Sequence, residues 1–288
     1  MEFDVDQPAV ESIFDVPDSE GRFSPARLAY LQAMGKRRPA VFLAFPPKAA
    51  GTYLRQAIIE ETGGDLIRVV HAQGGRDGQL YLPTFIAYYC GGVCPGPLVA
   101  HVHLLALGAN IRLLEAFGLK PVVMVRSIPD MLASYWDMLD REPASLQHGL
   151  NCAIPESWPS MSRGRKADFL ADMVAPWYIN FFAGWFAYAA QKDSPALLVR
   201  YGDFLKDPAL MLEKILAHSG LPAGRQDCER ALEEVWPNRA GLRFNRGVAG
   251  RGRDYFDPPH LKALERMLSY YPALAGHASE LLALEPAV

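Results

Sequence analysis

The stretch VFLAFPPKAAGTYL, residues 41–54, decides the fold. Its first five residues form a continuous apolar run, which is typical of a strand buried on both faces of a sheet. After Gly51, the apolar residues Leu54 and Ile58 recur at helical spacing. The stretch therefore predicts a strand, then a loop that contains Lys48, and then a helix.

The same order of strand and helix recurs twice along the chain. Residues 121–125 (PVVMV) form a second apolar run, which leads through Arg126 into a helical pattern at 131–139. Residues 196–199 form a third run, and a helical pattern follows at 207–220. Three such units predict an α/β fold with a central parallel sheet flanked by helices, in which ligands bind at the carboxyl ends of the strands.

Length and composition favour a single domain over residues 1–288. Half of the residues are hydrophobic (50%), which is enough for one large core. Residues 1–22 lack periodicity and predict an amino-terminal arm, and the run from Pro25 to Gly35 predicts a short helix. Residues 142–166 are rich in Ser, Pro, Asn and Arg and predict a loop or lid, and residues 79–97 have a less regular pattern.

Net charge and cysteine content limit the kinds of partner and the cellular compartment that we expect. The net charge of -3 gives no sign of a nucleic-acid partner. No apolar run reaches membrane-spanning length, and the acidic start of the sequence is unlike a signal peptide. The cysteines have neither zinc-site spacing nor the density of a disulfide scaffold, so we expect a reducing, cytoplasmic location; they are Cys90, Cys94, Cys152 and Cys228.

The loop after the first predicted strand suits a phosphate group. A strand-to-helix loop offers unpaired backbone N–H groups and the positive end of a helix dipole, to which Lys48 adds a full charge. The loop is not a Walker A motif, because Lys48 precedes the glycine and no Gly-Lys-Ser/Thr begins the helix. The missing motif argues against a magnesium-dependent NTPase. A nucleotide-dependent small-molecule kinase and a non-catalytic nucleotide-binding module are kept as alternatives.

A second anion site is predicted where the second strand ends. Ser134 follows Arg126 by eight residues, which is about two helical turns. Because helical side chains lean toward the amino end of their helix, Ser134 can point toward a group held by Arg126. An arginine fork and a hydroxyl group suit a terminal phosphate.

The chain resembles the PAPS-dependent sulfotransferases in these motifs. PPKAAGTYL at 46–54 is similar to the PKSGTTWL loop of that family, and RSIPDMLASYWDM at 126–138 is similar to its RNPKDVAVSYYHF signature. NRGVAGRGRDYF at 245–256 resembles the late RKGxxGDWKxxF loop, and YGD at 201–203 resembles Tyr-Glu-Asp. The resemblance implies a P-loop-like sulfotransferase architecture.

The resemblance also implies the cofactor and its ligands. The cofactor would be 3′-phosphoadenosine 5′-phosphosulfate (PAPS), with the bisphosphate PAP as product. By resemblance, the 3′-phosphate would be bound by Arg126, Ser134, Arg246 and Gly247, and Tyr201 would lie near the adenine. The 5′-phosphosulfate would be held by the first loop, that is, by Lys48, Ala49, Ala50, Gly51, Thr52 and Tyr53.

Sulfuryl transfer to an alcohol needs a base, and His103 is the candidate. HVHL at 101–104 resembles the family's Lys-Thr-His-Leu, in which the histidine deprotonates the acceptor and the lysine contacts the sulfonyl group, so His101 takes the lysine position. Lys48 would bridge the leaving oxygen and the sulfonyl group. The other histidines lack the spacing of metal ligands, so we expect no metal.

The acceptor is expected to be a small, apolar or lipid-like molecule with a hydroxyl group. Aromatic residues at 81–89 suggest such a pocket, and so do four tryptophans, Trp136, Trp158, Trp177 and Trp185. The helical pattern at 261–271 could dock a second copy of the chain, which leaves a homodimer open.

Overall fold

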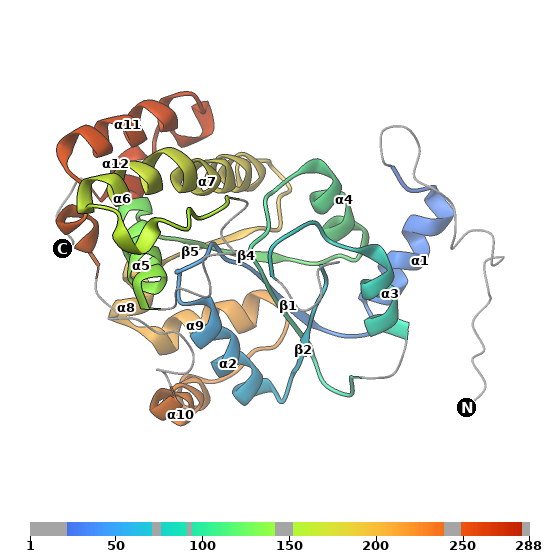
Figure 1. Cartoon of the computed structure of the whole chain (residues 1–288). Helices are drawn as coiled ribbons and strands as arrows, with labels where there is room; N and C mark the ends of the chain where they lie inside the picture. Colours follow the sequence, from blue (N-terminus) through green and yellow to red (C-terminus); the bar gives the residue numbers. More distant parts are fainter. Residues whose placement is uncertain (1–21, 71–75, 91–93, 142–151, 239–248, 284–288) are drawn as a thin grey trace.

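The computed structural model describes residues 22–70, 76–90, 94–141, 152–238 and 249–283. Five parallel strands form one sheet in the order β2-β3-β1-β4-β5 (Figure 1). The strands are β1 (Ala40–Ala44), β2 (Asp65–Ile67), β3 (Leu98–Val102), β4 (Pro121–Val125) and β5 (Leu197–Arg200). The predicted α/β fold with a central parallel sheet flanked by helices is confirmed.

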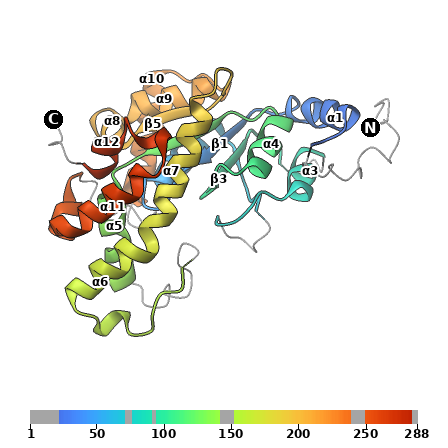
Figure 2. The same ribbon diagram turned by 90° about the horizontal axis from the view of Figure 1, so that it is seen from above.

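Helices cover both faces of this sheet. On one side α2 (Gly51–Thr62) packs against α9 (Pro208–His218) and α10 (Arg225–Val235), next to α8 (Tyr201–Lys206). On the other side lies α7 (Ala175–Ala189), as Figure 2 shows from above. The remaining helices are α1 (Pro25–Gly35), α3 (Leu82–Cys90), α4 (Gly108–Ala116), α5 (Ile128–Arg141), α6 (Arg163–Phe169), α11 (Pro258–Ser269) and α12 (Ala278–Leu282).

The strand order creates a switch point between β1 and β4. The chain leaves β1 through α2 toward β2, on one side of the sheet, and it leaves β4 toward β5, on the other side. β1 and β4 are neighbours, with Leu43 opposite Val122. Because the connections after these two strands diverge, a crevice is expected at their carboxyl ends. Lys48 and Arg126 follow these ends.

Several aromatic residues expected to line a pocket lie in the core instead. Trp185 in α7 is fully buried, and its Nε1 donates a hydrogen bond to the Leu104 carbonyl oxygen at 2.7 Å. Phe85 in α3 stacks on Phe117, with ring centroids 5.1 Å apart. Such side chains stabilise the packing of helices on the sheet by removing large apolar areas from water.

Two helices begin at the capping residues that the sequence predicts. The Ser24 side chain accepts a hydrogen bond from the Arg27 amide and caps α1, and Pro25 occupies its first turn. Asp207 caps α9 in the same way, accepting from the Leu210 amide at 2.9 Å. The prediction of a helix at 25–35 is confirmed.

Some predicted segments differ from the structure, and parts of others lie outside the described residues. Residues 79–97 contain a helix, α3, and residues 163–166 of the expected loop or lid form the start of α6. The helix predicted at 261–271 is α11, which packs on α7 of the same chain. Residues 1–21 of the predicted arm and 142–151 of the predicted lid lie outside the described residues. Across the described ranges, no helix is both long enough and apolar enough to cross a bilayer.

Candidate active site

The loop after β1 has a strained backbone that leads directly into α2. Lys48 and Ala50 both adopt left-handed conformations, with φ angles of 66° and 60°, which non-glycine residues rarely do. Ala50 is the N-cap of α2 and provides no side-chain cap. The first N–H groups of α2 therefore lack the usual side-chain acceptor, as in helix starts that bind phosphate.

Two side chains from other elements hold this loop in place. Arg126, which follows β4, donates a hydrogen bond from Nη1 to the backbone carbonyl oxygen of Lys48. Tyr178 in α7 donates from its buried hydroxyl group to the Pro47 carbonyl oxygen at 3.3 Å. The two predicted anion sites, the loop at Lys48 and the strand end at Arg126, are therefore in direct contact.

Arg126 lines a cavity of about 380 Å³ at the carboxyl ends of β4 and β5. Its guanidinium group lies 4.0 Å above the centre of the Tyr201 ring, a cation–π contact. The Nε atom of Arg126 is buried and has no hydrogen-bond partner among the described residues. A buried donor without an acceptor is costly, and the guanidinium charge at the wall of this cavity suits an anion. Residues 126, 130, 201, 250 and 253 are among those that line it.

Asp130, in the first turn of α5, holds the late glycine-rich loop. Its two carboxylate oxygens accept hydrogen bonds from the backbone amides of Gly250 and Gly252, each at 2.8 Å. A side chain at position 252 would lie 2.3 Å from the Pro129 Cβ, so only glycine allows this approach. Pro129 and Asp130 both belong to the motif at 126–138. They therefore hold in place the loop near residue 250, which belongs to the late motif at 245–256.

The other predicted cofactor residues are placed as follows. Ser134 is 3% exposed and does not line the cavity. Ala49 and Gly51 are buried, and Tyr53 donates its hydroxyl to the Leu232 carbonyl oxygen while contacting Trp236 edge to face. Trp236 is 46% exposed beside it, so Tyr53 supports an exposed aromatic ring. Arg246 and Gly247 lie outside the described residues.

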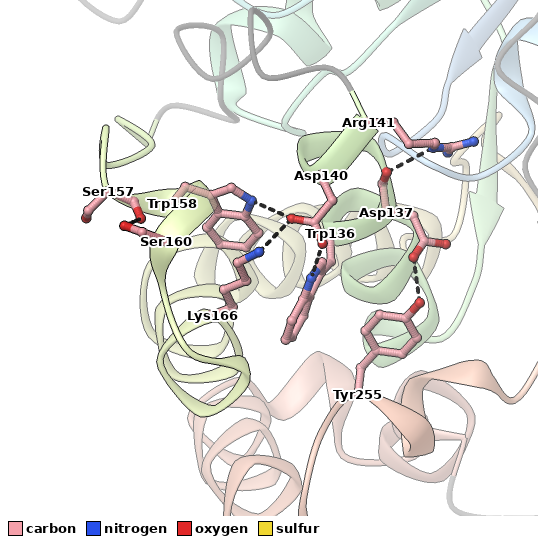
Figure 3. Close-up of polar contacts among 9 residues, drawn as sticks. All are labelled: Trp136, Asp137, Asp140, Arg141, Ser157, Trp158, Ser160, Lys166 and Tyr255. Atoms are coloured by element: carbon pink, nitrogen blue, oxygen red, sulfur yellow. Dashed lines mark hydrogen bonds and ion pairs between the residues drawn. The ribbon is translucent and has the colours of Figure 1, made fainter.

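A second polar cluster joins α5 to the helix α6 (Figure 3). Asp140 accepts hydrogen bonds from the indole N–H groups of Trp136 and Trp158, at 2.8 and 3.0 Å, and from the Lys166 ammonium group at 2.7 Å. Asp137, one turn earlier, accepts a hydrogen bond from the Tyr255 hydroxyl. Trp136 and Trp158 therefore belong to a structural cluster, which holds the segment after residue 152 against α5.

His103 follows β3 and is paired with a carboxylate. Its Nδ1 atom lies 2.9 Å from Oδ1 of Asp77. Burial alone would raise the pKa of Asp77, but the hydrogen bond and charge of His103 outweigh it and lower that pKa. An ionised carboxylate can only accept, so the Nδ1 atom carries the proton and donates. The Nε2 atom of His103 then keeps a free lone pair.

His101, two residues earlier on the same face of β3, is buried against the first loop. Its Nε2 atom lies 2.2 Å from the position that a Cβ of residue 51 would take, so Gly51 makes room for the ring. Arg76 Nη1 lies 3.4 Å from His101 Nδ1 and donates a hydrogen bond to Thr52 Oγ1 at 3.0 Å. Burial, with the charges of His103 and Arg76, lowers the pKa of His101 well below 6.5.

Arg76 and Asp77 complete this group, and no sequence motif or periodic pattern predicts them. They lie on a segment that runs beside the end of β3, where the His103 amide donates to the Arg76 carbonyl oxygen at 2.8 Å. Burial lowers the pKa of His103, and Arg76 and Lys48 act in the same direction, while Asp77 opposes them. Within the described ranges, no three His, Cys, Asp or Glu residues gather as a metal site.

Comparisons with known proteins show the fold. No family profile matches the chain, and no curated protein matches it. Among solved structures, mouse sulfotransferase SULT7A1 complexed with PAP matches with a TM-score of 0.58 and 16% identity, over 91% of this chain and 94% of that chain. Retinol dehydratase complexed with androsterone and PAP matches with a TM-score of 0.48 and 15% identity, over 86% and 85% of the two chains. The predicted sulfotransferase architecture is confirmed as the fold.

Proposed function

We propose that this chain is a PAPS-dependent sulfotransferase that sulfonates a hydroxyl group of a small, apolar or lipid-like molecule. The observation that carries the proposal is the contact between the two anion-binding loops, in which Arg126 donates to the Lys48 carbonyl oxygen at the switch point of the sheet. A nucleotide with phosphate groups at both its 3′ and 5′ positions fits two adjacent sites of this kind.

The 3′ end of the nucleotide is assigned to the cavity beside β4 and β5. The guanidinium charge of Arg126 at the cavity wall supports an anion there, and its Nε has no hydrogen-bond partner among the described residues. Tyr201 lies under the guanidinium group and fixes its plane. By resemblance, Ser134, Arg246 and Gly247 complete this half of the site.

The 5′ end is assigned to the first loop and the start of α2. Lys48 provides the charge, and Thr52 and the backbone at 49–51 provide hydrogen-bond donors. Bound PAPS would supply the sulfuryl group and a leaving phosphate that keeps the electron pair of the broken S–O bond. The role of Lys48 is to stabilise the negative charge that develops at this position.

His103 is assigned as the general base. Asp77 holds the proton on Nδ1, so Nε2 can accept the proton of the acceptor hydroxyl group as the new O–S bond forms. A lowered pKa keeps this nitrogen unprotonated at neutral pH. Asp77 is a positioning residue in this scheme, because it acts through His103.

Exposed apolar side chains near this end of β3 support an apolar acceptor. Asn110 accepts a hydrogen bond from the Leu80 amide and donates one to the Leu105 carbonyl oxygen, which joins two segments next to the site. On these segments Tyr81 and Leu107 are 40% and 45% exposed. Exposed apolar residues beside a polar reaction centre suit an apolar molecule with one hydroxyl group.

Sulfuryl transfer from radiolabelled PAPS to a panel of phenols, sterols and aliphatic alcohols tests the proposal. The wild type should transfer label, and His103→Ala and Lys48→Met should each lose about 100-fold or more of kcat. Lys192→Met, at an exposed lysine in the turn after α7, is the matched control. PAP binding without any transfer would instead support a non-catalytic binding module, and preferential binding of ATP with magnesium would support a kinase.

A further inference from the structure

We infer that Arg76 is a catalytic cation of this site and supplies, from outside β3, the fixed positive charge that His101 does not carry. The inference rests on the proposed function and concerns the 5′-phosphosulfate end of the nucleotide. It assigns a role to a residue on the short segment beside β3, which belongs to none of the motifs.

The first observation is that the side chain at position 101 is neutral. Arg76 can only donate, so its contact with Nδ1 of His101 requires a lone pair on that nitrogen. The ring is 4% exposed, and its Nε2 has no hydrogen-bond partner among the described residues. A buried ring next to a guanidinium group cannot hold a second positive charge at neutral pH, and the strongly lowered pKa agrees with this.

The second observation is the position of the Arg76 guanidinium group. Its Nη1 atom donates to Thr52 Oγ1 at 3.0 Å, so the charge lies at the first turn of α2. It also lies beside the pair of histidines, whose ring centroids are 5.5 Å apart. Arg76 therefore faces both the start of α2, where the 5′-phosphate is assigned, and His103, the assigned base.

The third observation is that backbone and side-chain contacts hold this segment at the end of β3. The His103 amide donates to the Arg76 carbonyl oxygen, and Asp77 bonds to the His103 ring, so two adjacent residues are fixed to the end of β3. Gly51 leaves space for the His101 ring against which Arg76 lies. The plane and the fixed charge of a guanidinium group suit the oxygens of a phosphosulfate group.

Ligand titrations separate the two ends of the nucleotide. PAP carries both phosphates, whereas adenosine 3′-monophosphate carries only the 3′ group. Arg76→Gln should weaken PAP binding about tenfold or more, because a charge-assisted contact is lost, and should leave the affinity for adenosine 3′-monophosphate unchanged. Arg76→Lys should keep most of the PAP affinity. Arg68→Gln, at an exposed arginine after β2, is the matched control.

Turnover provides a second and independent test. With PAPS and 1-octanol, Arg76→Gln should lower kcat about 100-fold, and the double variant Arg76→Gln/His101→Lys should recover activity, because it returns a fixed charge to the same place. Unchanged kcat and PAP affinity in Arg76→Gln would overturn the inference. Equal losses for PAP and adenosine 3′-monophosphate would also overturn it, since Arg76 would then act through the fold. If wild-type protein binds no PAP, the proposed function itself fails.

Discussion

Arg126 donates a hydrogen bond to the backbone carbonyl oxygen of Lys48, so the loops that follow β4 and β1 share one contact. The same guanidinium group lies 4.0 Å above the Tyr201 ring, and its Nε remains without a partner among the described residues. One arginine thus connects three strand ends and lies at the wall of the cavity.

Gly51→Ala should destabilise the protein although alanine is the better helix former. The new Cβ would lie 2.2 Å from His101 Nε2, and forcing such a contact costs about 1–3 kcal/mol. Urea unfolding of Gly51→Ala, His101→Ala and the double variant measures the effect. The double variant should be more stable than the sum of the single changes predicts, because His101→Ala empties the space. Strict additivity would show that the ring and residue 51 do not compete for this space.

Asp77→Asn should move the acid limb of kcat/KM to lower pH. Burial lowers the pKa of His103, and the neighbouring charges of Arg76 and Lys48 lower it too, whereas Asp77 raises it. Without the carboxylate the pKa falls further, so His103 stays unprotonated to lower pH, and the plateau rate falls because the ring is less well oriented.

Asp77→Ala provides the comparison for that profile. Alanine removes the acceptor for Nδ1 entirely, so its plateau should fall further than that of Asp77→Asn, whose amide oxygen can still accept. PAP affinity should stay at the wild-type value in both variants. An acid limb that stays in place, or moves to higher pH, contradicts the assignment of Asp77.

Stability should decrease as the pH falls below about 6.5, in part because of His101. Its folded pKa lies well below 6.5, the ordinary value, so the unfolded chain binds a proton that the folded chain does not. The stabilising effect of this ring is fully present above that value and is lost as the pH decreases toward the folded pKa. The free energy of unfolding of His101→Gln should depend less steeply on pH between 8 and 5, and an equally steep dependence would rule this out.

Gly252→Ala should separate the late loop from α5. A Cβ there would lie 2.3 Å from Pro129 Cβ, and the shift would break the bonds from Gly250 and Gly252 to Asp130. We expect a loss of about 1–3 kcal/mol of stability and weaker PAP binding, because Gly250 lines the cavity. Gly164→Ala, with open space around the position, is the matched control. Equal effects of the two changes would contradict the role of Gly252.

The sequence predicted the fold well where the signal was local. The apolar runs at 41–45 and 121–125 became β1 and β4, and the caps Ser24 and Asp207 begin helices. Strand β2 has only three residues, and α3 lies among glycines and aromatics that hide a helical period. The strand order depends on pairing between distant segments, so no local pattern could provide it.

The site could be predicted only in part, because local sequence patterns mark some of its residues and not others. The two motifs place Lys48 and Arg126 at strand ends, and the structure joins them. Arg76 and Asp77 belong to no periodic element, and they reach the site only because their backbone runs beside β3. Asp130 belongs to the second motif, but no local pattern shows its role, since the amides that it binds lie about 120 residues later.

PAP affinity measured by calorimetry, for wild type and Arg126→Gln, tests the central claim most directly. We expect wild-type protein to bind PAP more tightly than ATP with magnesium, and we expect Arg126→Gln to weaken PAP binding about tenfold or more. Arg165→Gln, at an exposed arginine of α6, should bind PAP as the wild type does. Preference of the wild type for ATP with magnesium, or wild-type PAP affinity in Arg126→Gln, would contradict the account.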